Sequence, residues 1–355
     1  MRVTHYARRS FVPVLLALAL AGCGKDSSGP STFDPQGTAA DVSAAQDAFA
    51  SGPTESFAAV SGNIAAVLNG SALVANSAGL VLSQPSKASA LYARRVASLV
   101  PARGAGIQAR VASIPSELAG VTFVWDESSD LYVASDLSGA PANGVRFLLY
   151  AVDPVLFRPV EPVVETGYVD IIDRSTLSTI DVQVQVVQNG VTYLDYAVVA
   201  SASSSSGTVT IEGFAFNGST RANFRLDNSV SETSEGIILS LDYHLDVPSR
   251  GVSIDWTATF ANMSESEVAV TLDLAVSGNN GDVRLVGTYT TGGGTFTVKV
   301  NGDPFATITL TAGAPIITGA AGQPLTPEEE QALEAVLESY EGSLYAFSEL
   351  LLPMT

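Results

Sequence analysis

Residues 237–256 read Ile-Ile-Leu-Ser-Leu-Asp-Tyr-His-Leu-Asp-Val-Pro-Ser-Arg-Gly-Val-Ser-Ile-Asp-Trp, and this stretch decides the fold. From its third residue to Val247, apolar and polar residues alternate, which places the two kinds on opposite faces of a β-strand. The alternation resumes at Val252 after Pro-Ser-Arg-Gly, a sequence typical of a turn. The stretch therefore predicts an antiparallel hairpin with Val247 opposite Val252 and His244 opposite Asp255.

The same period of two extends in both directions, from about Val121 to about Leu310. Turns of the Asn-Gly type punctuate it at 189–190, 217–218, 280–281 and 301–302. No helical stretch interrupts the region, so we expect no parallel crossover. Residues 116–315 are predicted to form a long antiparallel β-meander of about 10–12 strands. Because strands twist, a sheet this wide should curl into a half-open barrel, with a closed barrel or a sandwich as the alternatives.

Helices are predicted on both sides of the strands. Residues 38–115 are rich in Ala and Ser, and their apolar residues recur at helical spacings. Within 324–352, Thr326 is a capping residue, Pro327 takes the first helical position and Glu329 follows three residues after the cap. An apolar stripe follows in this range. We therefore expect an α+β fold in which Ala-rich N-terminal helices and one long C-terminal helix cover the apolar face of the sheet.

The first residues have the features of an export signal. A basic start precedes the apolar stretch 11–21, which as a helix would rise only about 16 Å and so could not cross a bilayer core of about 30 Å. The sequence Leu20-Ala21-Gly22-Cys23 follows and resembles the lipobox of bacterial lipoproteins. The resemblance implies that residues 1–22 are a lipoprotein signal peptide, that diacylglycerol is attached to Cys23, and that the chain is anchored to a membrane.

The residues after the cysteine extend this expectation. In lipoproteins of diderm bacteria, a residue other than Asp after the cysteine, here Gly24, implies the outer membrane, on its periplasmic or surface face. Residues 23–37 are rich in Ser, Gly and Pro and are predicted to be a flexible tether. Flanking helices and a lipid anchor fit a domain in the aqueous space better than a membrane-spanning barrel, which would need an outward apolar band and aromatic girdles.

Composition narrows the function. The formal net charge of −19 disfavours nucleic acid as a partner. The single cysteine and only two histidines, of which His5 lies in the leader, leave few nucleophile–base arrangements. We find no nucleophile elbow, phosphate-binding loop or zinc-binding motif. The sequence therefore predicts a protein that is not an enzyme, with no catalytic residues and no cofactor.

One group of residues could bind a metal ion. Asp242, His244 and Asp246 share one face of a predicted strand, and Asp255 is expected opposite the histidine. Residues two apart in a strand lie roughly 7 Å apart, so these ligands do not converge easily on one ion. We therefore favour a solvated polar face with one cross-strand His–Asp pair.

Three functions remain open. The first is a non-catalytic envelope lipoprotein that binds an apolar or amphipathic, lipid-like ligand in the curved sheet, in outline similar to the half-barrel lipoprotein carriers. It predicts an apolar cavity of roughly a few hundred Å³, to which Trp125 and Trp256 could contribute. The second is a structural or adhesion protein acting through loops or sheet edges. The third is a hydrolase that uses paired carboxylates.

Overall fold

The computed structural model describes residues 33–69, Tyr92, Val96 and 114–351, without short stretches at 154–157, 203–205, 234–235, 262–268, 291 and 312–314. The predicted signal peptide, Cys23 and most of the predicted tether lie outside the described residues. So does most of the predicted helical segment beyond residue 69.

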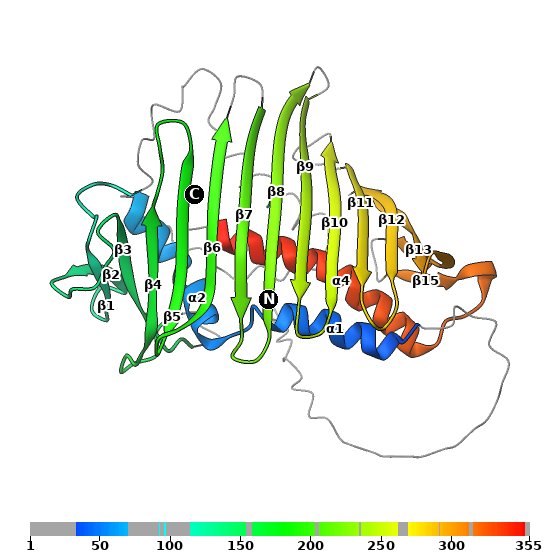
Figure 1. The fold of residues 1–355 in the computed structure, drawn as a ribbon, viewed down its shortest axis with the longest axis horizontal. Helices are drawn as coiled ribbons and strands as arrows, with labels where there is room; N and C mark the ends of the chain where they lie inside the picture. The colour runs from blue at the N-terminus through cyan, green and yellow to red at the C-terminus, as the bar shows by residue number, and fades with distance from the viewer. Residues whose placement is uncertain are drawn as a thin grey trace, which may run out of the picture. The chain divides into compact units, whose positions relative to one another are not determined.

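One fifteen-stranded sheet forms the body of the fold (Figure 1). Its strands are β1 Thr122–Asp126, β2 Leu131–Ser135, β3 Gly144–Tyr150, β4 Glu165–Asp173, β5 Ile180–Gln188, β6 Val191–Ala202, β7 Ser206–Phe216, β8 Arg221–Thr233, β9 Gly236–Val247, β10 Val252–Ala261, β11 Ala269–Ser277, β12 Val283–Thr290, β13 Gly293–Val300, β14 Asp303–Leu310 and β15 Ile316–Gly319. From β3 to β15 each strand pairs with the next one in the chain, always antiparallel. The antiparallel meander and the α+β class are thus confirmed, and the sheet is not closed, because β15 and β2 are its two ends.

The other end of the sheet corrects one expectation. β1 pairs antiparallel with β2 and also parallel with β3, through Thr122 opposite Arg146 and Phe123 opposite Phe147. The prediction that parallel pairing has no room is wrong here, because β2 and the loop after it serve as the crossover in place of a helix. The count of 10–12 strands was too low, because several short strands, such as the four-residue β15, add to the long ones.

The register follows from the alternation in the sequence. Val247 pairs with Val252 and His244 with Asp255, as predicted. Most apolar residues of the strands are buried on the inner face, and most of the polar residues that alternate with them are more exposed. The helices cover this inner face. At the turn between β5 and β6, Asn189 and Gly190 both have positive φ, at 50° and 76°, which is the backbone that an Asn-Gly hairpin turn requires.

In the described part of the chain, three long helices cover the inner face: α1 Pro35–Asp47, α2 Gly52–Asn69 and α4 Pro327–Leu351 (Figure 1). The Asp34 side chain caps α1 by accepting a 3.1 Å hydrogen bond from the Gly37 N–H. At the start of α4, the Thr326 Oγ1 accepts from the Glu329 N–H, and the Glu329 carboxylate accepts from the Thr326 N–H at 2.8 Å. This reciprocal pair is the capping box that the sequence predicted.

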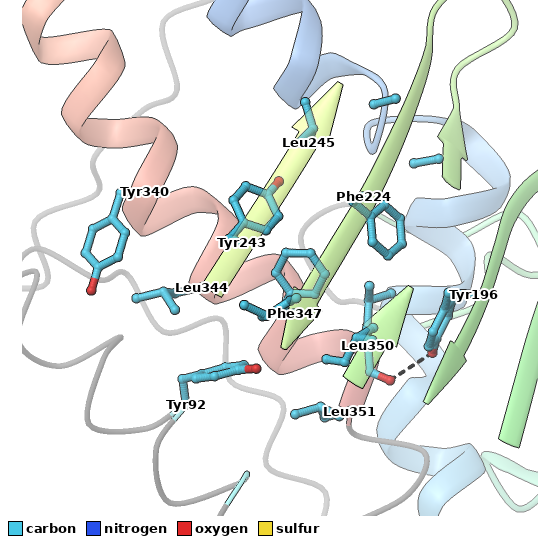
Figure 2. Packing of buried hydrophobic residues seen from close by; sticks show 14 of the residues in the cluster. Tyr92, Tyr196, Phe224, Tyr243, Leu245, Tyr340, Leu344, Phe347, Leu350 and Leu351 are labelled. Atoms are coloured by element: carbon cyan, nitrogen blue, oxygen red, sulfur yellow. Dashed lines mark hydrogen bonds between the residues drawn. The ribbon is translucent and has the colours of Figure 1, made fainter. Parts of the chain in front are cut away.

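The core lies between the helices and the sheet. The buried side of α4 contacts aromatic side chains from several strands. Phe347 packs against Phe224 of β8 and Tyr243 of β9 (Figure 2). Tyr340 packs against Trp256 of β10. Helix α1 runs beside α4, as their many mutual contacts show, and α2 covers the region of β2–β6. These two adjacent helices, α1 and α4, create the site described next.

Candidate functional site

A cleft of about 460 Å³ lies between α1, α4 and the inner face of β9 and β10. Its floor is formed by Tyr243, Leu245 and Ile254, and Phe347 of α4 lies over Tyr243. Figure 2 shows Tyr243 between Phe347 and Leu245, close to the α4 ribbon. The cleft is therefore part of the interface between the helical layer and the sheet, at the centre of the meander.

The cleft exists because small side chains line its helical walls. On α4 these are Ser339, Gly342, Ser343 and Ala346, whose spacing of three and four residues places them on one face of the helix. On the other side, α1 contributes Ala45 and the chain just after it contributes Ala50. Such side chains let the two backbones approach, but they leave the space beneath them unfilled.

Tyr243 gives the floor its most unusual feature. The residue is only 3% exposed, yet its hydroxyl forms no hydrogen bond with any described residue. Burial, and to a smaller degree the negative charge of Asp255, raises the pKa of this hydroxyl, so it keeps its proton at physiological pH. The hydroxyl oxygen is not among the described side-chain atoms that are fully buried without a partner, so it opens onto the cleft and can bond to a molecule there.

Other buried tyrosines of the same face show the usual arrangement. The Tyr196 hydroxyl donates to the Leu350 carbonyl oxygen at 2.8 Å, and the Tyr132 hydroxyl donates to the Leu148 carbonyl oxygen at 2.7 Å. The Tyr92 hydroxyl donates to Asn228 Oδ1 at 2.7 Å. Tyr243 is distinguished from these residues by facing the cleft without a protein partner.

Polar groups at the side of the cleft come from Gln46 and Glu55, both exposed. Glu55 is the one charged residue among the described residues that line the cleft, and none of these is Lys or Arg. Together with the net charge of −19, this lining disfavours an anionic ligand. The remainder of the wall is apolar or carries only serine hydroxyls.

The residues considered for metal binding lie on the opposite, outer face of the sheet. His244 Nδ1 lies 2.6 Å from Asp255 Oδ1, while His244 Nε2 is 3.9 Å from Asp246 Oδ1. Asp246 also accepts a 3.2 Å hydrogen bond from Asn223. Asp242 instead faces Asp227 of the neighbouring strand. Within the described part of the chain, no three His, Cys, Asp or Glu side chains are grouped to hold a metal ion.

A second depression, of about 510 Å³, lies on that outer face around the small side chain of Ala275. Asp273 and Arg284 flank it and pair with each other, with 2.8 Å between Arg284 Nε and Asp273 Oδ1. Asp273 raises the pKa of the Arg284 guanidinium, mainly by accepting its hydrogen bond and then through its negative charge. Although it is slightly larger, this depression has a polar, exposed lining, so the inner cleft is the stronger candidate.

The two tryptophans have different surroundings. Trp256 stacks beneath Tyr243 at a centroid distance of 4.9 Å, whereas Trp125 packs against Tyr132 of the terminal strand β2. The sequence thus pointed to one aromatic residue near the cleft but did not single out Tyr243 or Phe347. The signal that could have found the cleft is the row of small residues from 339 to 346 on a helix that is otherwise rich in large apolar side chains.

Comparison with known proteins gives no counterpart: no protein-family model, no curated protein and no solved structure matches the chain. Among the helices that the structure describes, none combines the length and the apolar character that crossing a membrane requires.

Proposed function

We propose that this chain is a non-catalytic lipoprotein of a bacterial envelope that binds an apolar or amphipathic ligand in the cleft between α1, α4 and the sheet. The cleft itself carries the proposal, because its volume of about 460 Å³ falls within the range of roughly 300–1,000 Å³ common for small-molecule sites. A cavity of about 150 Å³ already holds benzene, so the cleft has room for a ligand about three times that size.

We also propose that the sheet is curved in the manner of a half-open barrel. Tyr289 of β12 approaches Tyr340 of α4, with 3.3 Å between their hydroxyl oxygens, and Tyr196 of β6 bonds to the Leu350 carbonyl. Along α4 these two contact points are only about 15 Å apart. Six strand spacings on a flat sheet would cover about 29 Å. A sheet that curls toward the helix would bring β6 and β12 to these neighbouring points.

The ligand-binding proposal can be tested with one substitution in the cleft. Ala346→Leu places three additional carbons in the cleft and removes no hydrogen bond. We expect the full chain to bind the apolar fluorescent probe N-phenyl-1-naphthylamine, and A346L to bind it at least about tenfold more weakly. Glu334→Leu, an equally apolar change at an exposed position of α4, should leave binding unchanged. Failure of the unmodified chain to bind, or equal binding by A346L, would contradict the proposal.

Anchoring needs an experiment of its own. Replacing Cys23 by Ala in a bacterial host should move the protein from the membrane fraction to the soluble fraction, because two or more acyl chains on that residue would provide the anchor. Retention of the C23A protein in the membrane fraction would reject the lipoprotein assignment and would leave the cleft proposal untouched.

The ends of the sheet favour a second candidate function, adhesion or assembly through sheet edges. Both β2 and β15 have one neighbour, and each carries an apolar residue that is well exposed: Val133 at 39% and Ile316 at 57%. Open edges of this kind can pair with strands of another chain. Val133→Lys together with Ile316→Lys should abolish any concentration-dependent association seen by analytical ultracentrifugation, and association that persists would exclude this candidate.

A further inference from the structure

We propose that the ligand of the cleft is an uncharged amphipath with a hydrogen-bond-accepting oxygen, such as an ester or ketone carbonyl, which accepts a hydrogen bond from the Tyr243 hydroxyl. This inference rests on the proposed function and adds the chemical class of the ligand. It is carried by one observation, a tyrosine that is 97% buried as a residue and whose hydroxyl reaches the cleft without a hydrogen-bond partner among the described residues.

The first step concerns what the hydroxyl lacks. The oxygen is not one of the fully buried side-chain atoms without a partner, which among the described residues belong to Thr38, Thr122, Thr166 and Trp256, so it opens onto the cleft. A ligand oxygen placed there can replace water as its hydrogen-bond partner. The surrounding groups supply none, because Tyr243 is flanked by the Trp256 ring at 4.9 Å and the Phe347 ring at 5.4 Å. The hydroxyl is therefore the one polar contact that the floor offers to a molecule lying on Leu245 and Ile254.

The second step concerns the direction of the bond. The hydroxyl retains its proton because burial opposes ionisation, and the nearby Asp255 charge adds to this effect. It can therefore donate to an oxygen of the ligand. Tyrosine hydroxyls elsewhere on this inner face donate to carbonyl oxygens in the same way, as Tyr196 does to Leu350 and Tyr132 to Leu148.

The third step concerns charge. A carboxylate or phosphate placed on this floor would lose its hydration without gaining a cation, since the described lining holds no Lys or Arg. Glu55 at the side of the cleft repels it further. A cationic group could lie near Glu55, but it would leave the Tyr243 hydroxyl unpaired. An uncharged ligand can accept a hydrogen bond from the Tyr243 hydroxyl with its oxygen and pack its apolar remainder on Leu245 and Ile254.

The protein contains a reporter for this bond. Trp256 stacks on Tyr243, whereas the other tryptophan, Trp125, packs on Tyr132 of β2, so ligand contact with Tyr243 should alter the fluorescence of Trp256. The W125F variant removes the second signal and serves as the protein for titration.

The test compares four probes that share a twelve-carbon chain: methyl laurate, dodecane, laurate at pH 8 and dodecyltrimethylammonium. Each is titrated into the full-length W125F protein, with tryptophan fluorescence and calorimetry as readouts. We expect methyl laurate to bind at least about tenfold more tightly than any of the other three. Tyr243→Phe should reduce its affinity to that of dodecane, while the protein remains as stable as the unmodified chain, because the removed oxygen has no partner among the described residues. Tyr196→Phe, which removes a bonded hydroxyl outside the cleft, should leave the preference for methyl laurate unchanged.

The outcomes separate this inference from the function on which it rests. If none of the probes binds, the ligand-binding proposal fails together with the inference. If dodecane or laurate binds as tightly as methyl laurate, or if Y243F keeps the preference for the ester, the cleft remains an apolar binding site and the assigned ligand class is wrong. Tightest binding of the cationic probe would also overturn the inference.

Discussion

The hydroxyl of Tyr196 on β6 donates a 2.8 Å hydrogen bond to the backbone carbonyl oxygen of Leu350, in the last turn of α4 (Figure 2). The last four carbonyl groups of a helix have no partner within the helix, so this bond satisfies one that would otherwise be buried unpaired. Both residues are buried. The bond therefore fixes the end of α4 to one strand of the sheet.

Tyr196→Phe should lower the free energy of unfolding by about 1 kcal/mol, the usual value of one buried neutral hydrogen bond. Urea denaturation followed by circular dichroism measures the change. The matched substitution Tyr243→Phe should cost nothing in the absence of ligand, because its hydroxyl has no partner among the described residues. Equal losses in the two variants would show that the two hydroxyls do not differ as described.

The N-terminal helix has its own connection to the sheet. Asp41 is 5% exposed and accepts hydrogen bonds from Arg250 Nη1 at 3.0 Å and from Asn280 Nδ2 at 2.6 Å. Asp41→Ala leaves both donors without their acceptor. Because Arg250 is partly exposed, we expect a loss of about 2 kcal/mol rather than the larger cost of a fully buried pair.

Differential scanning calorimetry measures this loss as a lower Tm. The control is Asp273→Ala, which breaks the ion pair with Arg284 on the exposed outer face. That pair should contribute less than about 1 kcal/mol. A D41A protein that melts no lower than D273A would mean that Asp41 does not hold α1 in place.

A buried polar network connects Tyr92 to the sheet. Asn228 of β8 accepts a 2.7 Å hydrogen bond from the Tyr92 hydroxyl and donates a 2.7 Å bond to the Val209 carbonyl oxygen. Asn228→Leu should destabilise the protein by about 1–3 kcal/mol, because it leaves both partners buried and unpaired. In the double variant with Tyr92→Phe one of these groups disappears, so the loss should be smaller than the sum of the two single losses. Additive losses in chemical denaturation would contradict the network.

Glu341 of α4 should make stability depend on pH. Burial, and then the negative charge of Glu338, raises the pKa of its carboxyl group from 4.5 to about 7. Between these two pH values the unfolded chain ionises Glu341 while the folded protein keeps it protonated. The contribution of Glu341 to the free energy of unfolding is therefore most favourable below about pH 4.5 and falls until about pH 7. The free energy of unfolding of E341Q, relative to that of wild type, should therefore rise by up to about 2 kcal/mol from pH 4.5 to pH 7, and this difference should stay constant above pH 7.

The measurement is the difference in urea midpoint between E341Q and wild type at several pH values from 4 to 8. Glu334→Gln changes an exposed glutamate of the same helix and should show no such rise. A difference that is flat from pH 4 to pH 8 would show that Glu341 ionises normally in the folded protein.

Most of the sheet could be predicted from the sequence, because strand register depends on a local pattern. The alternation before Val247 and after Val252 fixed both their pairing and that of His244 with Asp255. The parallel contact of β1 with β3 could not be predicted in this way. A local pattern shows that a strand exists, but it does not show on which side of an earlier strand it will lie.

The cleft could not be predicted from the sequence for a related reason. It is lined by Ala45 of α1 and Ala346 of α4, and these residues come from opposite ends of the described chain. The unpaired hydroxyl of Tyr243 was also hidden, since its place in the alternation predicts an ordinary core residue. What distinguishes it from Tyr196 is the presence or absence of a partner contributed by another element.

The strand order has a consequence for how the molecule is made. From β4 onward each strand pairs with the strand synthesised just before it, so this part of the sheet can be assembled in the order of translation. Helix α1 is made first, yet it must wait for α4, whose residues Pro327–Leu351 are among the last to be added. The cleft is consequently the last part of the described structure to form, and a chain that stops before Pro327 would hold all fifteen strands of the sheet without the cleft.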